Sequence, residues 1–400
     1  MGSHHGHGET DIPRASRATT RTLAVLVALI VAATAIGAAA IWPTKASEAD
    51  SVPVAADGSS WVHATVMSTP RADGTVRAAV EGATPYQRTM TLQPRMNVLP
   101  KIGDRVVAFE VTPGGDLYFW EYQRSSPMIV LLVLYLIAVI AVARWRGVGA
   151  LLGLALAAGI LIFFAVPSLF SGHSPLAVGM VSGSGALLIL IYMAHGVNAR
   201  ATTAYLGTIG GLLLTGLIGA WAVSSSHLTG YWTEEGGQLE LVDRHVSLPG
   251  LVLCGVILAG LGVLNDITVT QASAVWELRA AKPHAGRREI FARGMRIGRD
   301  HIASTVYTLA FAYVGAALPI IMLVSLYDSS LAMTMTSEDI AEEIVRTLVG
   351  SIGLVLAVPL TTLIAVFVAH TRQPDASEGV ATEPRVIAPV APTGSVATRR

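Results

Sequence analysis

The sequence has little charge for its length. Asp, Glu, Lys and Arg together make up 14% of its 400 residues, whereas hydrophobic residues make up 52%. A soluble domain carries about a quarter charged residues, so the missing charge indicates a protein surrounded by lipid. Acidic and basic residues number 27 each, which removes the basic excess typical of nucleic-acid binding. We therefore expect the lipid bilayer as a partner and no nucleic acid.

Cysteine and enzyme motifs are also scarce. The single cysteine, Cys254, lies in an apolar run, so neither a disulfide framework nor a cysteine metal site can be built. The sequence has no Walker A motif, no His-Glu-x-x-His and no Gly-x-Ser-x-Gly. We expect no catalytic residues, no metal, no cofactor and no enzyme activity.

Eight apolar runs have about the length that a membrane-crossing helix needs. They lie at 23–42, 128–143, 148–167, 176–195, 203–223, 249–270, 303–327 and 347–369. Only residues 144–147 separate the second run from the third, which predicts a tight helical hairpin. The first run is interpreted as an uncleaved anchor, with a cleaved signal peptide as the alternative.

Basic residues mark one side of the predicted membrane domain. The connection at 276–302 holds seven basic and three acidic residues, whereas the connections at 224–248 and 328–346 are mostly acidic. Because basic loops stay inside, we predict cytoplasmic termini in an inner membrane. The tails at 1–22 and 370–400 are predicted to be disordered, and whether the histidine-rich start is native or a tag stays open.

Residues 43–127 are predicted to form a small outer domain. Short β-prone runs occur at 61–67, 74–80, 89–92, 105–111 and 117–122, separated by Gly, Pro and Asp. Five such strands favour a barrel of OB-like or SH3-like type. The predicted fold is thus an all-α polytopic membrane protein of about eight helices, with this β domain between helices 1 and 2. The domain is either a sensor or partner-binding module, or a structural cap.

Small residues recur at helical spacing in two of the runs. Such stripes let two helix backbones approach closely, either within one chain or between the copies of a homo-oligomer. The residues concerned are Gly179, Gly183, Gly207, Gly211, Thr215 and Gly219.

Polar residues at predicted membrane depth are candidates for function, because lipid makes them costly. Asp266, Thr270, Ser273 and Glu277 share one face of the sixth run, and Asp300, Ser304 and Thr308 share a face at the start of the seventh. These faces indicate either a substrate or ion path or a hydrogen-bonded structural seam. Further pathway candidates are His195, Asn198, Asn265, Gln271, His301, Glu343, Arg346 and Ser351.

The segment before the last run is predicted to be amphipathic. One side of residues 337–346 and of the turn that follows is apolar, with Ile340, Ile344 and Leu348, and the other side is acidic. This arrangement suits a helix that lies at the outer interface of the membrane. The last run itself is interrupted by glycines and by Pro359. That pattern is typical of transporter cores but equally fits a plain kink.

Three motifs resemble one family of bacterial membrane proteins, YibE/F. They are GVLNDITVTQASAVWEL at 262–278, GRDHIASTV at 298–306 and AEEIVRTLVGSIGL at 341–354. The resemblance covers about residues 115–369 and implies an eight-span protein of the bacterial cell membrane. It does not supply an activity.

The sequence therefore leaves two functional hypotheses. The first is a secondary transporter or permease component that moves a small solute or ion, with Asp266 as the coupling carboxylate. The second is a membrane scaffold or envelope-stress partner whose outer domain binds another protein.

Overall fold

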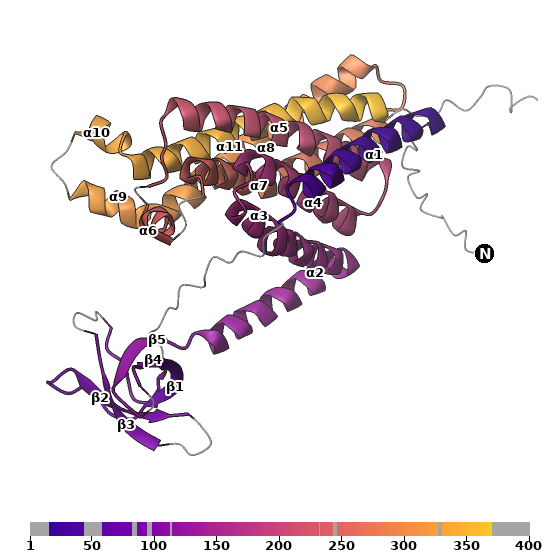
Figure 1. The fold of residues 1–400 in the computed structure, drawn as a ribbon. Helices are drawn as coiled ribbons and strands as arrows, with labels where there is room; N and C mark the ends of the chain where they lie inside the picture. Colours follow the sequence, from indigo (N-terminus) through magenta and orange to yellow (C-terminus); the bar gives the residue numbers. More distant parts are fainter. Residues whose placement is uncertain are drawn as a thin grey trace, which may run out of the picture.

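A computed structural model describes residues 16–43, 58–81, 86–93, 98–112, 114–231, 233–242, 246–326 and 330–369. The described residues form a helical bundle and a small β barrel (Figure 1). The tails proposed to be disordered lie largely outside the described residues.

The barrel is closed by five strands, as predicted. They are β1 (Ser60–Val66), β2 (Thr75–Val80), β3 (Tyr86–Thr91), β4 (Arg105–Glu110) and β5 (Leu117–Tyr122), in the spatial order β1-β2-β3-β5-β4. Alternate residues point inward, and Val66, Val76, Met90 and Val106 are fully buried in the core. Arg88 and Glu110 also lie inside as an ion pair, and the Glu110 carboxylate accepts from the Gly114 N–H at 2.8 Å.

The bundle contains all of the helices found among the described residues. These are α1 (Arg17–Ala40), α2 (Ser125–Ile160), α3 (Val166–Phe170), α4 (Pro175–His195), α5 (Ala199–Ser225), α6 (Glu234–Val242), α7 (Leu248–Ala281), α8 (Arg287–Ala316), α9 (Leu318–Ser325), α10 (Leu331–Met335) and α11 (Glu338–Val368). A π-helical turn, η1 (Leu161–Ala165), joins α2 to α3.

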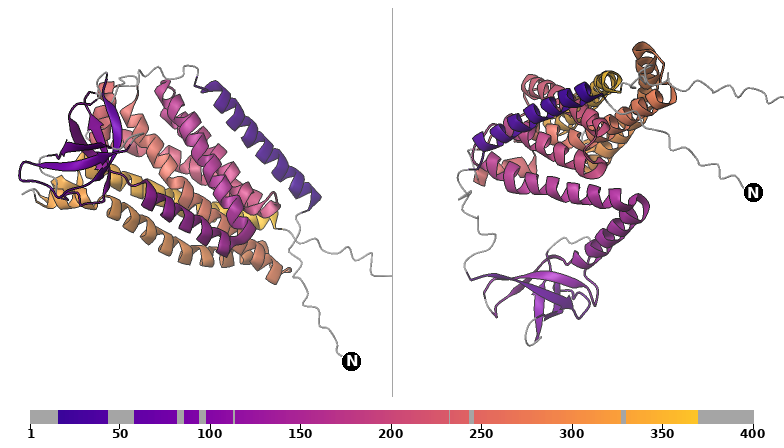
Figure 2. Two further views of the ribbon diagram at one scale, coloured as in Figure 1. Left: turned by 90° about the horizontal axis from the view of Figure 1, so that it is seen from below. Right: turned by 90° about the vertical axis from the view of Figure 1, so that its right-hand side faces the viewer.

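Six helical segments of the described chain are long and apolar enough to cross a membrane. They are α1, the continuous stretch from Ser125 to Phe170, α4, α5, α7 and α11. Three of the eight expected runs differ from this set. The pair 128–143 and 148–167 lies in the single stretch, which bends sharply at Arg144 (φ 54°, ψ −133°) into two limbs (Figure 2). The run 303–327 is divided between α8, which ends at Ala316, and α9, which begins at Leu318.

Helices α5, α7 and α11 form the centre of the bundle. Gly211 of α5 packs against Leu264 of α7 and Ala357 of α11. The second limb of α2 and helix α1 cover α4, whereas α8 lies on the other side against α7 and α11. Figure 2 shows the first limb of α2 leaving the bundle toward the barrel.

The two ends of the bundle carry opposite charge. At what we call the basic end, Leu23, Trp276 and Val368 pack together, and Arg200, Arg279 and the start of α8 lie near them. At the acidic end, Val223 and Val252 pack together beside the start of α11 with Glu338 and Asp339. The segment 337–346, expected as a separate interfacial helix, is instead continuous with α11.

Candidate functional site

The polar face of α7 lies on the surface of the bundle next to α8. The side chain of Asp266 is 66% exposed, and its Oδ2 lies 4.0 Å from Nε2 of His301 on α8. The Thr270 hydroxyl donates to the Asp266 carbonyl at 2.7 Å, and Ser273 is half-buried. Nearer the basic end, a carboxylate oxygen of Glu277 lies 3.7 Å from a guanidinium nitrogen of Arg200 on α5. The stripe therefore holds one carboxylate–imidazole pair and one ordinary ion pair.

Asp266 lies well inside the two ends of the bundle. Helices α4 and α7 run parallel, and Gly183 of α4 packs against Leu261 of α7. Twelve residues later α4 ends at His195, which is therefore level with residue 273 of α7. Asp266 precedes that level by seven residues, or about 10 Å, and follows Val252 by fourteen, or about 21 Å. The carboxylate therefore lies along the middle part of α7, a helix long and apolar enough to cross a membrane.

Helix α8 contributes His301 rather than Asp300 to the pair. Asp300, Ser304 and Thr308 lie on the exposed face of α8. The Thr308 hydroxyl donates to the Ser304 carbonyl at 3.1 Å, which satisfies its hydrogen without a partner helix. The structure does not bring this row opposite the polar face of α7.

A buried seam of polar side chains joins the helices of the bundle close to the Asp266–His301 pair. The Gln271 amide donates to the Gly294 carbonyl of α8 at 2.9 Å and to the Thr362 hydroxyl of α11 at 2.7 Å. Thr208 of α5 and Thr268 of α7 share a hydroxyl contact of 2.5 Å. Gln271 is thus held as a structural crosslink between three helices.

Asn265 differs from its neighbours on α7. Its side-chain oxygen is buried and has no hydrogen-bond partner among the described residues. It lies next to Asp266 in sequence but about 100° away around the helix. The structure does not bring Asn265 into the seam of Gln271.

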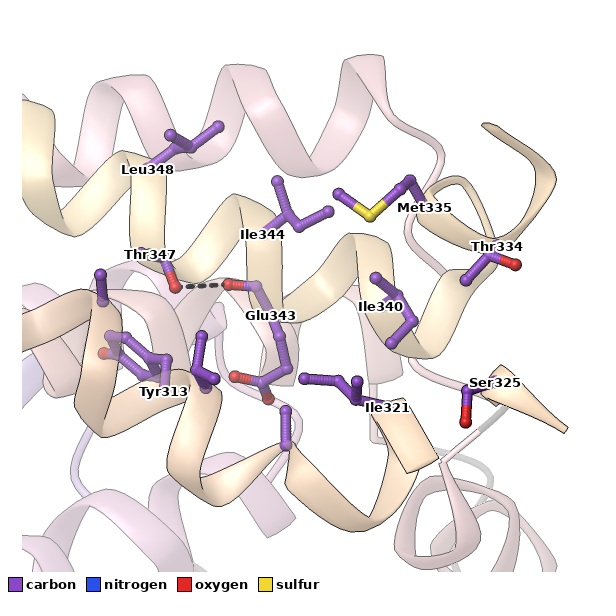
Figure 3. Close-up of a pocket in the computed structure, with 13 residues that line it drawn as sticks. Tyr313, Ile321, Ser325, Thr334, Met335, Ile340, Glu343, Ile344, Thr347 and Leu348 are labelled. Carbon is purple, nitrogen blue, oxygen red and sulfur yellow. Dashed lines mark hydrogen bonds between the residues drawn. The ribbon is translucent and has the colours of Figure 1, made fainter. Parts of the chain in front are cut away.

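A cavity of about 620 Å³ opens near the acidic end between α8, α9, α10 and α11. Figure 3 shows the Glu343 carboxylate within it, between Tyr313 and Ile321. The guanidinium of Arg346 donates to Glu343 at 2.7 Å and to Glu342 at 2.5 Å. One cation thus bridges Glu343, which lines the cavity, and Glu342, which does not.

The remaining sequence candidates lie elsewhere. His195 Nδ1 is 3.3 Å from the Ile191 carbonyl, and Asn198 caps α5 by accepting from the Ala201 N–H at 2.9 Å. Ser351 is half-buried on α11. The small-residue stripes face helices of the same chain: Gly179 and Gly183 pack on α7, whereas Gly207, Gly211, Thr215 and Gly219 pack on α11 and α7.

Several residues of these sites gave no signal in the sequence. Tyr313 looks like an ordinary aromatic residue of an apolar run, and Thr362 follows a proline. Arg279, counted only as a loop charge, is 5% exposed and donates to the Ala285 carbonyl at 2.6 Å. Among the described residues, no group of three or more His, Cys, Asp or Glu could hold a metal ion.

The membrane part of the chain matches one protein family. The family model described as YibE/F-like protein covers residues 131–371, from the first limb of α2 to the end of α11. This chain belongs to that family. Searches among curated proteins and solved structures gave no match.

Membership of the YibE/F-like family confirms the resemblance seen in the three motifs. Together with the long apolar helices, it identifies a membrane protein. The Asp266–His301 pair, the seam and the cavity all lie inside the matched region, whereas the barrel precedes it.

Proposed function

We propose that this YibE/F-like protein is a secondary transporter or permease component that moves a small solute or ion along α7, α8 and α11. The observation that carries the proposal is the Asp266–His301 pair between α8 and α7, the second of which is long and apolar enough to cross a membrane. Ionisable side chains in lipid are costly and are usually kept for ion or substrate pathways.

The proposed roles follow from position. Asp266 is the coupling carboxylate, and His301 is its ionic partner across the α7–α8 contact. The cavity at Glu343 is the substrate site, about 12 residues or 18 Å further along α8, at Tyr313. Gln271 keeps the three helices together while the polar groups change charge.

The charge asymmetry supports an orientation. We propose a bacterial inner-membrane protein of eight spans whose basic end faces the cytoplasm and whose barrel lies outside. In that arrangement the two limbs of α2 cross separately, and α8 with α9 makes the seventh crossing. Labelling single cysteines introduced at Ser60 and at Arg287 with a membrane-impermeant maleimide tests it: intact cells should label the first position only.

Charge movement tests the transport proposal. Proteoliposomes adsorbed on a solid-supported membrane are exposed to concentration jumps of Na⁺, K⁺ or Mg²⁺, or to a pH jump. We expect a transient current for at least one of these ions. Asp266→Asn should reduce it at least tenfold, because the amide cannot carry the charge that couples the movement.

Asp300→Asn provides the matched control. Asp300 is also an exposed carboxylate of this region, one residue from His301, but it lies on another face of α8. Its current should match that of the unaltered protein. Equal currents in all three proteins would reject the coupling role of Asp266, and currents no larger than those of empty vesicles would favour a function without transport.

A second candidate function rests on the barrel. Trp61, Phe109, Tyr118 and Trp120 form an aromatic patch on the outer face of β1, β4 and β5. The Trp61 ring centroid lies 4.9 Å from that of Phe109 and 4.7 Å from that of Trp120. Trp61, Tyr118 and Trp120 are 40–50% exposed. Exposed aromatic groups are enriched where proteins bind one another, so this patch supports a scaffold that holds a protein partner.

A crosslinking experiment separates the two candidates. A photoreactive amino acid at Tyr118 should give one discrete protein adduct in cells if the barrel is a docking module. Trp61→Ala should abolish that adduct. A deletion phenotype restored by Asp266→Asn but not by Trp61→Ala would favour the scaffold over the transporter.

A further inference from the structure

The cavity near the acidic end has an apolar wall with one charged group. Ile321, Ile340, Ile344 and Leu348 supply most of its surface together with alanine and valine side chains. Its volume of about 620 Å³ falls in the range of pockets that hold drug-sized molecules. A ligand that fills it must therefore present a largely apolar body.

The polar groups in the wall determine which charge such a body can carry. Of the described residues that line the cavity, none is Lys, Arg or His, and Glu343 is the one carboxylate. Arg346 does not reverse this sign, because it also binds Glu342, and two carboxylates with one guanidinium leave one negative charge when ionised. Glu338 and Asp339, in the first turn of the same helix, add further negative charge.

Tyr313 supplies a second feature suited to a cation. Figure 3 shows its ring on the cavity wall beside the Glu343 carboxylate. The face of an aromatic ring attracts a cation that has lost its water, and a carboxylate beside it adds a direct charge interaction. An anion would meet Glu343 without a compensating basic residue in the wall.

We infer that this cavity binds an organic cation with an apolar body, with Glu343 and Tyr313 as the charge-recognising groups. That the cation is the transported solute rests on the proposed function; that the cavity binds it rests on the geometry alone. The same features disfavour a lipid tail as the occupant, because a tail gains nothing from a carboxylate in the wall.

Two probes of matched size and opposite charge test the inference. Tetraphenylphosphonium is an apolar cation, and tetraphenylborate is its anionic counterpart. Binding of each to the full chain in nanodiscs is measured by equilibrium dialysis, with empty nanodiscs subtracted. We expect saturable binding of the phosphonium and no saturable binding of the borate.

Variants then assign the binding to the cavity. Glu343→Gln should weaken phosphonium binding at least tenfold, whereas Asp339→Asn, which changes a carboxylate on the same helix outside the cavity wall, should leave it within twofold. Val314→Trp should reduce binding by filling space from the exposed face of α8, and it does not remove the Arg346 ion pairs. Thermal unfolding of each variant verifies that it is folded.

The outcomes are distinct. Equal binding of both probes, or phosphonium binding that neither Glu343→Gln nor Val314→Trp weakens, would overturn the inference, as would a copurifying lipid displaced by Val314→Trp. Glu343-dependent binding without any transport current would uphold the site and reject the proposed function. A transport current with no saturable phosphonium binding would uphold the proposed function and reject the cation site.

Discussion

The close contact between α5 and α11 can be tested at Gly211. A Cβ atom placed there would lie 2.9 Å from Leu264 Cδ2 and 3.0 Å from Ala357 Cβ. Carbon atoms prefer separations of about 3.5–4.0 Å. The Leu264 methyl group can rotate away, but Ala357 has no side-chain torsion to change. Gly211→Ala must therefore push α5 and α11 apart by several tenths of an ångström.

The expected energy follows from two opposing effects. Overpacking a tight core costs about 1–3 kcal/mol, whereas replacing glycine by alanine inside a helix gains about 1 kcal/mol. Gly262 of α7 supplies the control, because a Cβ there would have nothing within 4 Å. Gly262→Ala should therefore keep the helical gain alone. The two variants should differ by about 2 kcal/mol in the free energy of unfolding.

Thermal unfolding in one detergent, followed by fluorescence-detected size-exclusion chromatography, measures the difference. At about 2–4 °C per kcal/mol, Gly211→Ala should unfold about 6 °C below Gly262→Ala. Gly211→Val should lower the midpoint further, because its extra methyl groups meet the same wall. Equal midpoints for Gly211→Ala and Gly262→Ala would show that α5 and α11 do not touch as closely as described.

Three further predictions concern other parts of the chain. Hydrogen bonding from the Arg88 guanidinium lowers the pKa of Glu110. The stabilisation of the barrel by the Glu110 carboxylate is therefore complete above the unfolded pKa of about 4.3 and is lost as pH falls through the folded value. Circular dichroism should show that acid below about pH 4 destabilises the unaltered protein more than the Glu110→Gln variant, which is already less stable at pH 7. Gln271→Leu keeps the volume but removes two buried hydrogen bonds, so thermal unfolding should show a loss of about 2 kcal/mol, whereas an unchanged midpoint would contradict the crosslink. Glu338 accepts from the Thr229 hydroxyl at 2.7 Å, so Glu338→Ala should speed amide exchange at residues 229–230 in mass spectrometry, while exchange in α4 stays unchanged.

The barrel shows how much of the fold the sequence pattern alone predicts. The β-prone runs separated by Gly, Pro and Asp located β1, β2, β4 and β5 to within one residue at either end, because β-branched and aromatic residues suit a half-buried strand. β3 begins at Tyr86, three residues before the predicted start at Thr89. The reason is Arg88: a basic residue reads as solvent-facing, yet here it points inward to Glu110. A buried ion pair between strands far apart in sequence leaves no local pattern.

The connection between α7 and α8 was predicted with less success. The sequence assigned residues 276–302 to a cytoplasmic loop because of their charge. In the structure α7 continues to Ala281 and α8 begins at Arg287, so the turn is short. Arg279 holds it by donating to the Ala285 carbonyl. Charge density correctly indicated which end is basic but could not distinguish an irregular loop from two charged helix ends.

The polar stripe of α7 required the most revision. A stripe on a membrane helix was expected to face either the bundle interior or a wet cavity, because lipid cannot solvate it. Interior positions of α7 are instead taken by Leu264, Thr268 and Gln271, which contact α5, α8 or α11. Asp266 is left on the surface with His301 as its one recorded ionic partner among the described residues. A carboxylate about 10 Å inside the level of His195 and still two-thirds exposed implies that something other than lipid lies beside the α7–α8 contact. Water drawn in along the charged half of α8, or a second copy of the chain, meets that requirement, and either one would place the Asp266–His301 pair at the boundary of the bundle rather than at its centre.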